Sequence, residues 1–205
     1  MEIHIEGNQC IGIGGGIYRQ GDGIKITSGS IYVGGACEKI IGIGCLEGSM
    51  PIDISNCRLM VDMNVATGIG IGCRKGNQNI KIANTRMDIM GAGSYMCGVG
   101  STEKTGGVIN VYSSRLVIKI NGQQVRLLGN EGGDLYIITE HVRFELTSEG
   151  SSVSGVGSFD KSATIKGKLA TYDINIHAGV YVPLGATEEN MTFDGGERLI
   201  KINED

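Results

Sequence analysis

Four arginines recur at nearly one fixed interval along this chain of 205 residues. They are Arg58, Arg86, Arg115 and Arg143, with successive spacings of 28, 29 and 28. If each interval returns the chain to the same place in a repeated structure, the four guanidinium groups form an outward row about 5 Å apart. Unit charges at that spacing repel by about 0.9 kcal/mol per neighbouring pair even in water, so the row needs counter-charges or an anionic partner.

Acidic residues on the same strand face offer the counter-charge. Exposed ion pairs of this kind contribute about 0 to 1 kcal/mol each. The sequence therefore leaves two interpretations open: a neutralised charge ladder, and a stripe that binds uronic-acid sugars or another acidic polymer. The acidic residues of this face are Asp62, Asp88, Glu145 and Asp173. The residues predicted to contact a ligand are Arg58, Arg86, Arg115, Arg143, Asp88, Glu145 and Asp173.

Glu145 and Asp173 are separated by 28 residues, the same interval as the arginines. They are therefore predicted to stack as a pair of carboxylates on neighbouring turns of the repeated structure, which we call coils. Paired carboxylates can share a proton, bind calcium or serve glycoside cleavage. Arg143 lies close before Glu145 on the same strand, so a salt bridge is the simpler expectation.

The histidines and glycine motifs do not form a catalytic constellation. His4, His141 and His177 fall in different coils and columns, so they predict neither a metal cluster nor a nucleophile with its base. The glycine-rich segment at residues 12–15 lacks the following helix that phosphate binding requires. We therefore expect no catalytic residue, no metal site and no cofactor.

Six cysteines lie in the first half of the chain without Cys-x-x-Cys spacing: Cys10, Cys37, Cys45, Cys57, Cys73 and Cys97. A chain of this length needs no disulfide staple, so buried unpaired thiols are the expectation. Cys45 and Cys73 are separated by the same interval as Arg58 and Arg86, and should stack on adjacent coils. A disulfide between them is within reach, but in-register parallel strands disfavour its torsion.

A repeat of about 28 residues positions all of these side chains. An apolar residue followed by glycine recurs at spacings of 30, 28, 28, 29, 28 and 28, as Ile13-Gly14, Ile43-Gly44, Ile71-Gly72, Val99-Gly100, Leu128-Gly129, Val156-Gly157 and Leu184-Gly185. This glycine predicts a turn, because a positive φ favours glycine. The next residue is small in every coil and predicts a narrow corner: Gly15, Cys45, Cys73, Ser101, Asn130, Ser158 and Ala186.

Three further columns are apolar and alternate with outward neighbours at period two, which is a strand signature. They start at Ile24, Ile31 and Val33 and end at Phe193, Ile200 and Ile202. Equal spacing stacks each strand on its counterpart one coil earlier, in register. The expected fold is all-β: a single-stranded right-handed parallel β-helix of about seven coils, with three strands per coil and no significant helix.

Residues 1–205 should form one β-helix domain, since no linker interrupts the repeat. Ile3 and Ile5 precede Ile31 and Val33 by one full repeat, which indicates that the chain begins inside a coil. Neither the first nor the last strand is flanked by an amphipathic capping helix, so both edges are expected to be open. Three possibilities follow for these edges: the chain is a piece of a longer protein, a neighbouring subunit covers the open ends by self-association, or acidic residues protect them, namely Glu2, Glu6, Glu204 and Asp205.

The repeat resembles glycine-rich (Gly-Ile-Gly) parallel β-helix repeats in surface proteins of gut Firmicutes. The likeness rests on Gly-Ile-Gly, a variable loop, Ile-x-Ile and a final Ile/Leu-x-Val/Ile, and residues 21–25 (Gly-Asp-Gly-Ile-Lys) are similar to related carbohydrate-binding domains. It is strongest over residues 10–120 and weaker beyond, where Arg-Leu-Leu-Gly at residues 126–129 replaces Gly-Ile-Gly. The resemblance implies the pectate-lyase-like superfold, whose members include lyases, hydrolases, adhesins and non-catalytic binding modules.

Composition narrows the classes of partner. A formal net charge of −4 gives no broad basic surface, so nucleic-acid binding is not expected. Apolar runs stay well below the length of about 18 residues that a spanning helix needs, so membrane insertion is not expected either. Three Phe, seven Tyr and no Trp offer few platforms for sugar stacking, which favours a polar or ionic site.

These observations favour a non-catalytic β-solenoid module, binding or structural, with carbohydrate or another acidic ligand on its arginine-bearing face. Two alternatives remain: a calcium-assisted polysaccharide lyase or glycoside hydrolase of the pectate-lyase-like class, and an intracellular scaffold or sensory domain. Short, uniform coils leave little room for an active-site cleft. The expected location is the cell surface for a piece of a larger protein and the cytoplasm for a full chain.

Overall fold

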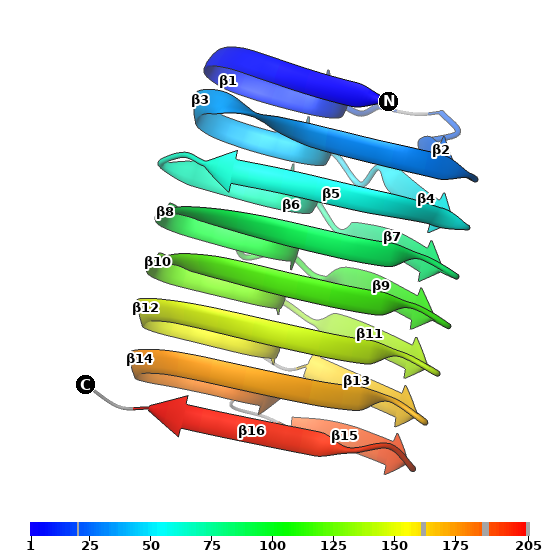
Figure 1. Ribbon diagram of the computed structural model, residues 1–205, viewed down its shortest axis with the longest axis vertical. Coiled ribbons are helices and arrows are strands. Elements are labelled where there is room, and N and C mark those ends of the chain that lie inside the picture. Colours follow the sequence, from blue (N-terminus) through cyan, green and yellow to red (C-terminus); the bar gives the residue numbers. More distant parts are fainter. Residues whose placement is uncertain (20, 161–162, 186–188, 204–205) are drawn as a thin grey trace.

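The computed structural model describes residues 1–19, 21–160, 163–185 and 189–203, which form an all-β parallel solenoid of about seven coils (Figure 1). These residues contain no helix, and hence none long and apolar enough to cross a membrane. The strands are β1 (Glu2–Ile17), β2 (Ile24–Ile26), β3 (Gly29–Glu47), β4 (Pro51–Ser55), β5 (Cys57–Asn64), β6 (Thr67–Lys75), β7 (Gln78–Ala83), β8 (Arg86–Gly100), β9 (Gly107–Tyr112), β10 (Arg115–Asn130), β11 (Leu135–Glu140), β12 (Arg143–Ser158), β13 (Ala163–Lys168), β14 (Thr171–Gly185), β15 (Glu189–Asp194) and β16 (Arg198–Asn203).

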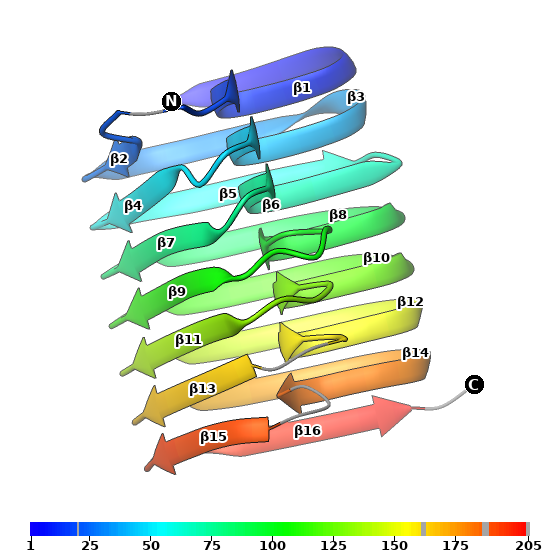
Figure 2. The ribbon, with the colours of Figure 1, turned by 180° about the vertical axis from the view of Figure 1, so that it is seen from behind.

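The strands form two parallel sheets. The long sheet has the order β1-β3-β5-β8-β10-β12-β14-β16, with β6 pairing to β3 and β8, and the short sheet has the order β15-β13-β11-β9-β7-β4-β2. Figures 1 and 2 show that most long strands bend sharply, so that one strand covers two sides of the coil. Of the three strands expected per coil, two are joined into one long strand. Only β5 and β6 remain separate among the described residues.

The column of apolar residues that each precede a glycine, here called the anchor column, is confirmed. Ile13 pairs with Ile43, Ile43 with Ile71, Ile71 with Val99, and the series continues through Leu128, Val156 and Leu184. Inward residues of all three sides merge into one buried cluster along the axis. Its largest rings are Phe144 and Tyr172, which stack at 5.1 Å with an interplanar angle of 13°. Burial of these side chains is the main source of stability in such a fold.

At both ends the expected register is wrong by two residues. Ile3 pairs with Val33 rather than Ile31, because the longer spacing that separates Ile13 from Ile43 already applies from the start of β1. In the last coil Ile174 pairs with Ile200 and Ile165 with Met191. A shift of two residues keeps every side chain on the same side of the sheet, so alternation alone cannot detect it.

The glycine of each anchor pair lies inside a strand rather than in a turn. In all seven coils its φ is positive, between +101° and +151°, at Gly14, Gly44, Gly72, Gly100, Gly129, Gly157 and Gly185. A Cβ atom on each of the first six would overlap the carbonyl oxygen of the corresponding glycine in the next coil. Left-handed backbone and close packing between coils therefore both require glycine.

One further column of left-handed residues turns the chain from the short sheet into the next long strand. Its members are Asn56, Asn84, Ser113, His141 and Leu169, with φ between 45° and 54°. His141 is thus one of the residues at which the chain turns. Asparagine tolerates this conformation well, whereas leucine does not.

The expectation of unpaired thiols is wrong for two of the six cysteines. Cys10 and Cys37 form a disulfide with a Cα–Cα distance of 6.4 Å, joining the first coil to the second. Cys37 stands in register with Gly7 rather than with Cys10, so column spacing did not pair the two cysteines. Cys45, Cys57, Cys73 and Cys97 are free and buried.

The column of small residues is largely confirmed. Gly15 pairs with Cys45, and Cys45 with Cys73. Asn130 pairs with Ser158, and both are fully buried. Ala186 lies outside the described residues.

Candidate functional site

The predicted arginine row is present on the outer side of the long sheet. Arg58 pairs with Arg86, Arg86 with Arg115 and Arg115 with Arg143, while Ser30 and Thr171 flank the row. All four arginines are exposed. Each lies at the start of its strand, as the first residue of β8, β10 and β12 and the second of β5, two positions after a left-handed corner residue. The guanidinium groups therefore follow the axis at about one strand spacing, roughly 4.8 Å.

Glu145 joins the last two arginines of the row. Its carboxylate accepts hydrogen bonds from Nε and Nη2 of Arg115, at 3.1 and 3.0 Å, and lies 2.9 Å from Nε of Arg143. The hydrogen bond from Arg115 lowers the pKa of Glu145, and the same contact raises the pKa of Arg115. This bidentate geometry is the strongest that an arginine and a carboxylate can form.

The first two arginines are less neutralised. Nε of Arg86 lies 3.6 Å from Asp88, within its own strand. Arg58 forms no ion pair with any described residue. Charge compensation in the row thus increases from β5 toward β12.

Asp173 stacks in register on Glu145, as predicted. Glu145 is engaged by two arginines, in agreement with the salt bridge expected for it. Within the described ranges, no three His, Cys, Asp or Glu side chains gather in a way that could hold a metal ion. Of the two carboxylates, Glu145 is the one paired with arginines of the row.

A cleft along β6 and the C-terminal parts of β3, β8 and β10 was not predicted. A small apolar cluster of Ile41, Ile69 and Cys97, separate from the main core, is buried in the same strands. A cavity of about 350 Å³ lies beside it. Its lining residues combine amides, hydroxyls and charges around one tyrosine: Lys39, Thr67, Arg74, Tyr95, Thr102, Glu103, Gln124 and Glu131. Tyr95 is 47% exposed.

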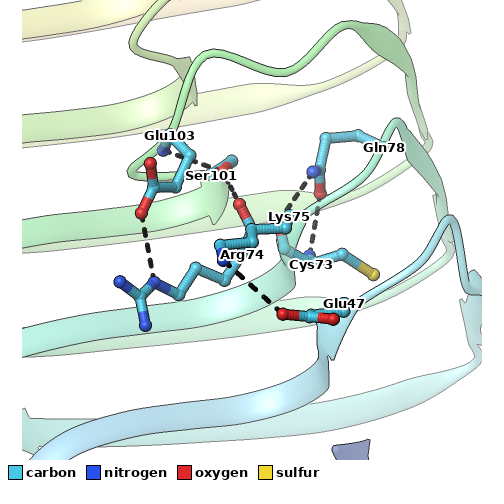
Figure 3. A network of polar contacts seen from close by, with 7 residues as sticks. All are labelled: Glu47, Cys73, Arg74, Lys75, Gln78, Ser101 and Glu103. Carbon is cyan, nitrogen blue, oxygen red and sulfur yellow. Dashed lines mark hydrogen bonds and ion pairs between the residues drawn. The ribbon is translucent and has the colours of Figure 1, made fainter. Parts of the chain in front are cut away.

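Polar contacts between coils fix one rim of this cleft (Figure 3). Nε of Arg74 lies 3.2 Å from Glu103, and the hydroxyl of Ser101 donates to the carbonyl of Arg74 at 2.9 Å. The buried amide of Gln78 accepts from the backbone N–H of Cys73 at 3.0 Å and donates to its carbonyl at 2.8 Å. The end of β6 is therefore hydrogen-bonded both to Ser101 and to Gln78.

A buried arginine is paired with Glu131, one of the residues that line the cleft. Arg126 pairs in register with Cys97, is 2% exposed, and forms an ion pair with Glu131. Its guanidinium lies 4.2 Å from the ring centre of Phe159 and donates to the carbonyl of Val125 at 2.9 Å. A buried charge needs such partners, because desolvation without them is expensive.

The repeat did carry a signal for the separate apolar cluster. In Ile41-Gly42-Ile43 the two isoleucines are two positions apart, so a regular strand would place them on one face. The structure instead places Ile43 in the main core and Ile41 in the separate cluster. An apolar residue two positions before the anchor therefore indicated a second, outer layer of packing.

Comparisons of this chain with known protein families, with curated proteins and with solved structures found no match. The fold is thus established by the structure alone, and the resemblance to Firmicutes surface repeats remains a hypothesis.

Proposed function

We propose that this chain is a non-catalytic β-solenoid binding module that holds an acidic polymer, such as a uronic-acid polysaccharide, along its arginine row. The observation that carries the proposal is the straight, in-register row from Arg58 to Arg143, with Arg58 free of ion pairs among the described residues. A polymer that carries one carboxylate per repeat unit can meet several guanidinium groups at once.

The charge balance of the face determines where such a polymer would bind. Asp88 and Glu145 engage three of the four arginines. The excess of positive charge is therefore greatest at Arg58 and Arg86. Binding should depend on these two residues and weaken with salt, since exposed charges are screened.

The test is a calorimetric titration of the full chain with polygalacturonate oligomers. We expect R58A/R86A to weaken binding on the order of tenfold, as for the loss of charge-assisted hydrogen bonds. The matched control, K25A/K81A, removes the same charge from the outer side of the short sheet, where these lysines flank Asp53. No binding by the unaltered chain, or equal weakening in both variants, would refute the proposal.

A second candidate is a sugar-binding cleft around Tyr95. The half-exposed ring offers a stacking surface, and Thr67, Gln124 and Glu103 supply donors and acceptors beside it. This is the mix of one apolar surface and several directed polar groups that small-ligand sites use. A glycan array should then show binding of a neutral oligosaccharide that Tyr95→Ala abolishes and that Tyr136→Ala, exposed on β11, preserves.

A further inference from the structure

Two of the free cysteines are much closer to each other than to any other thiol. Cys45 and Cys73 are register partners in β3 and β6, and their sulfurs are 2.8 Å apart. A disulfide has a bond length of about 2.05 Å, so the sulfurs need to approach by only about 0.8 Å. Cα atoms of parallel register partners lie about 4.8 Å apart, inside the range that disulfides span. The torsion that in-register strands disfavour would make this disulfide easier to reduce, as a reversible link requires.

The pair lies outside the main core, beneath a short turn. Cys45, Met50 and Cys73 form a satellite cluster with Tyr18 and Ile24. This turn connects β3, which ends at the exposed residue Glu47, to β4, and it contains the exposed residue Ser49. Opening a short turn costs less free energy than unfolding the core, so a small reagent can reach these sulfurs from the native state.

The two thiols are not equivalent. Cys45 donates a hydrogen bond to the sulfur of Cys73, which lowers the pKa of Cys73 and raises the pKa of Cys45. By contrast, Cys97 is fully buried, which raises its pKa, and its sulfur faces the carbonyl of Gly129 at 3.7 Å. Cys57 has Thr85 as its neighbour, at 3.7 Å.

We propose that Cys45 and Cys73 are a redox-active dithiol that a small disulfide oxidises to a second covalent link between coils. The Cys73 thiolate attacks one sulfur of the oxidant R–S–S–R, whose bond breaks and releases R–SH after protonation. Cys45 then loses its proton, and its sulfur attacks the sulfur of Cys73 and displaces the second R–SH. In sum, the protein loses two hydrogens and one oxidant molecule becomes two thiols.

The link would extend the covalent connection along the axis. Cys10–Cys37 joins the first coil to the second, and Cys45–Cys73 joins the second to the third. Oxidation would therefore join three successive coils covalently.

The experiment treats the full native chain with glutathione disulfide, alkylates the remaining thiols under denaturing conditions and maps the peptides by mass spectrometry. Glu47 and Asp53 lie between Cys45 and Cys57, so cleavage after acidic residues separates them. We expect a Cys45–Cys73 cross-linked peptide, with Cys57 and Cys97 alkylated as internal controls. The proposal is overturned if Cys45 and Cys73 are alkylated as completely as Cys97.

Single variants then test the order of attack. In Cys45→Ser, Cys73 should retain glutathione as a mixed disulfide, because the resolving thiol is absent. In Cys73→Ser, Cys45 should retain far less. Equal labelling of the two would refute Cys73 as the attacking residue. Peptide mapping of the unaltered chain does not depend on whether either variant folds.

Discussion

Arg115 binds Glu145 of the next coil through two parallel hydrogen bonds, 3.1 and 3.0 Å long. The two residues are 30 positions apart in the sequence, one coil plus two. This diagonal places one carboxylate between Arg115 and Arg143, so the row is stabilised within the protein at one end and available to a ligand at the other.

Glu145→Gln should lower stability by about 1 kcal/mol or less, because the pair is partly exposed. The folded-state pKa of Glu145 is lowered by Arg115. Its contribution is therefore present at neutral pH and is lost as the pH falls from about 4.3 through the folded-state value.

Urea unfolding of the Glu145→Gln variant at a series of pH values should show a weaker dependence of stability on acid than the unaltered chain. Asp173→Asn is the control, because the stacked Asp173 forms no ion pair with an arginine of the row among the described residues. An equal change in both variants would contradict this role for Glu145.

Gly129→Ala should destabilise the fold by about 3 kcal/mol or more or prevent folding, because strain and overlap act together. The φ of Gly129 is +151°, and a Cβ there would overlap the carbonyl oxygen of Gly157. Gly132→Ala, whose Cβ would lie 3.4 Å from its nearest neighbour, should change stability little. Thermal unfolding followed by circular dichroism compares the two. Similar melting temperatures would show that the glycine column is not a packing requirement.

Leu169→Asn should stabilise the protein by about 1 kcal/mol, since an ordinary side chain in the left-handed region costs about 1 to 2 kcal/mol and asparagine relieves part of this. Leu169 has a φ of 49° and is 51% exposed, and the equivalent corners at Asn56 and Asn84 already carry asparagine. Leu169→Ala removes the side chain without relieving the backbone and serves as the comparison. Chemical denaturation in which the alanine variant equals or exceeds the asparagine variant would rule out this explanation.

A protein that consists of these 205 residues should associate through its ends at high concentration. β1 and β16 are edge strands, and Leu199 and Ile200 of β16 are 50% and 41% exposed. Unpaired strand edges and apolar side chains favour pairing with another chain. Sedimentation velocity should show a concentration-dependent rise in mass that Ile200→Lys reduces and Ile138→Lys, on the outer side of β11, leaves intact. A strictly monomeric chain at all concentrations would argue against association.

The sequence by itself determined the coil length, the inward columns and the arginine row. Each of these depends on the separation between equivalent residues, and parallel pairing converts separation directly into position. The anchor column from Ile13 to Leu184 and the pairs from Arg58 to Arg143 were predictable for this reason.

Only the tertiary structure decided what depends on the bends between strands. The two-residue shifts at Ile3 and Ile200 preserve the inside and outside pattern, so no sequence period reveals them. Spacing also missed the Cys10–Cys37 disulfide, because Cys37 is in register with Gly7, and the separate cluster of Ile41, which packs apart from Ile43. Spacing fixes which coil a residue occupies, whereas the direction of its side chain at a corner depends on local backbone angles and on the packing around it.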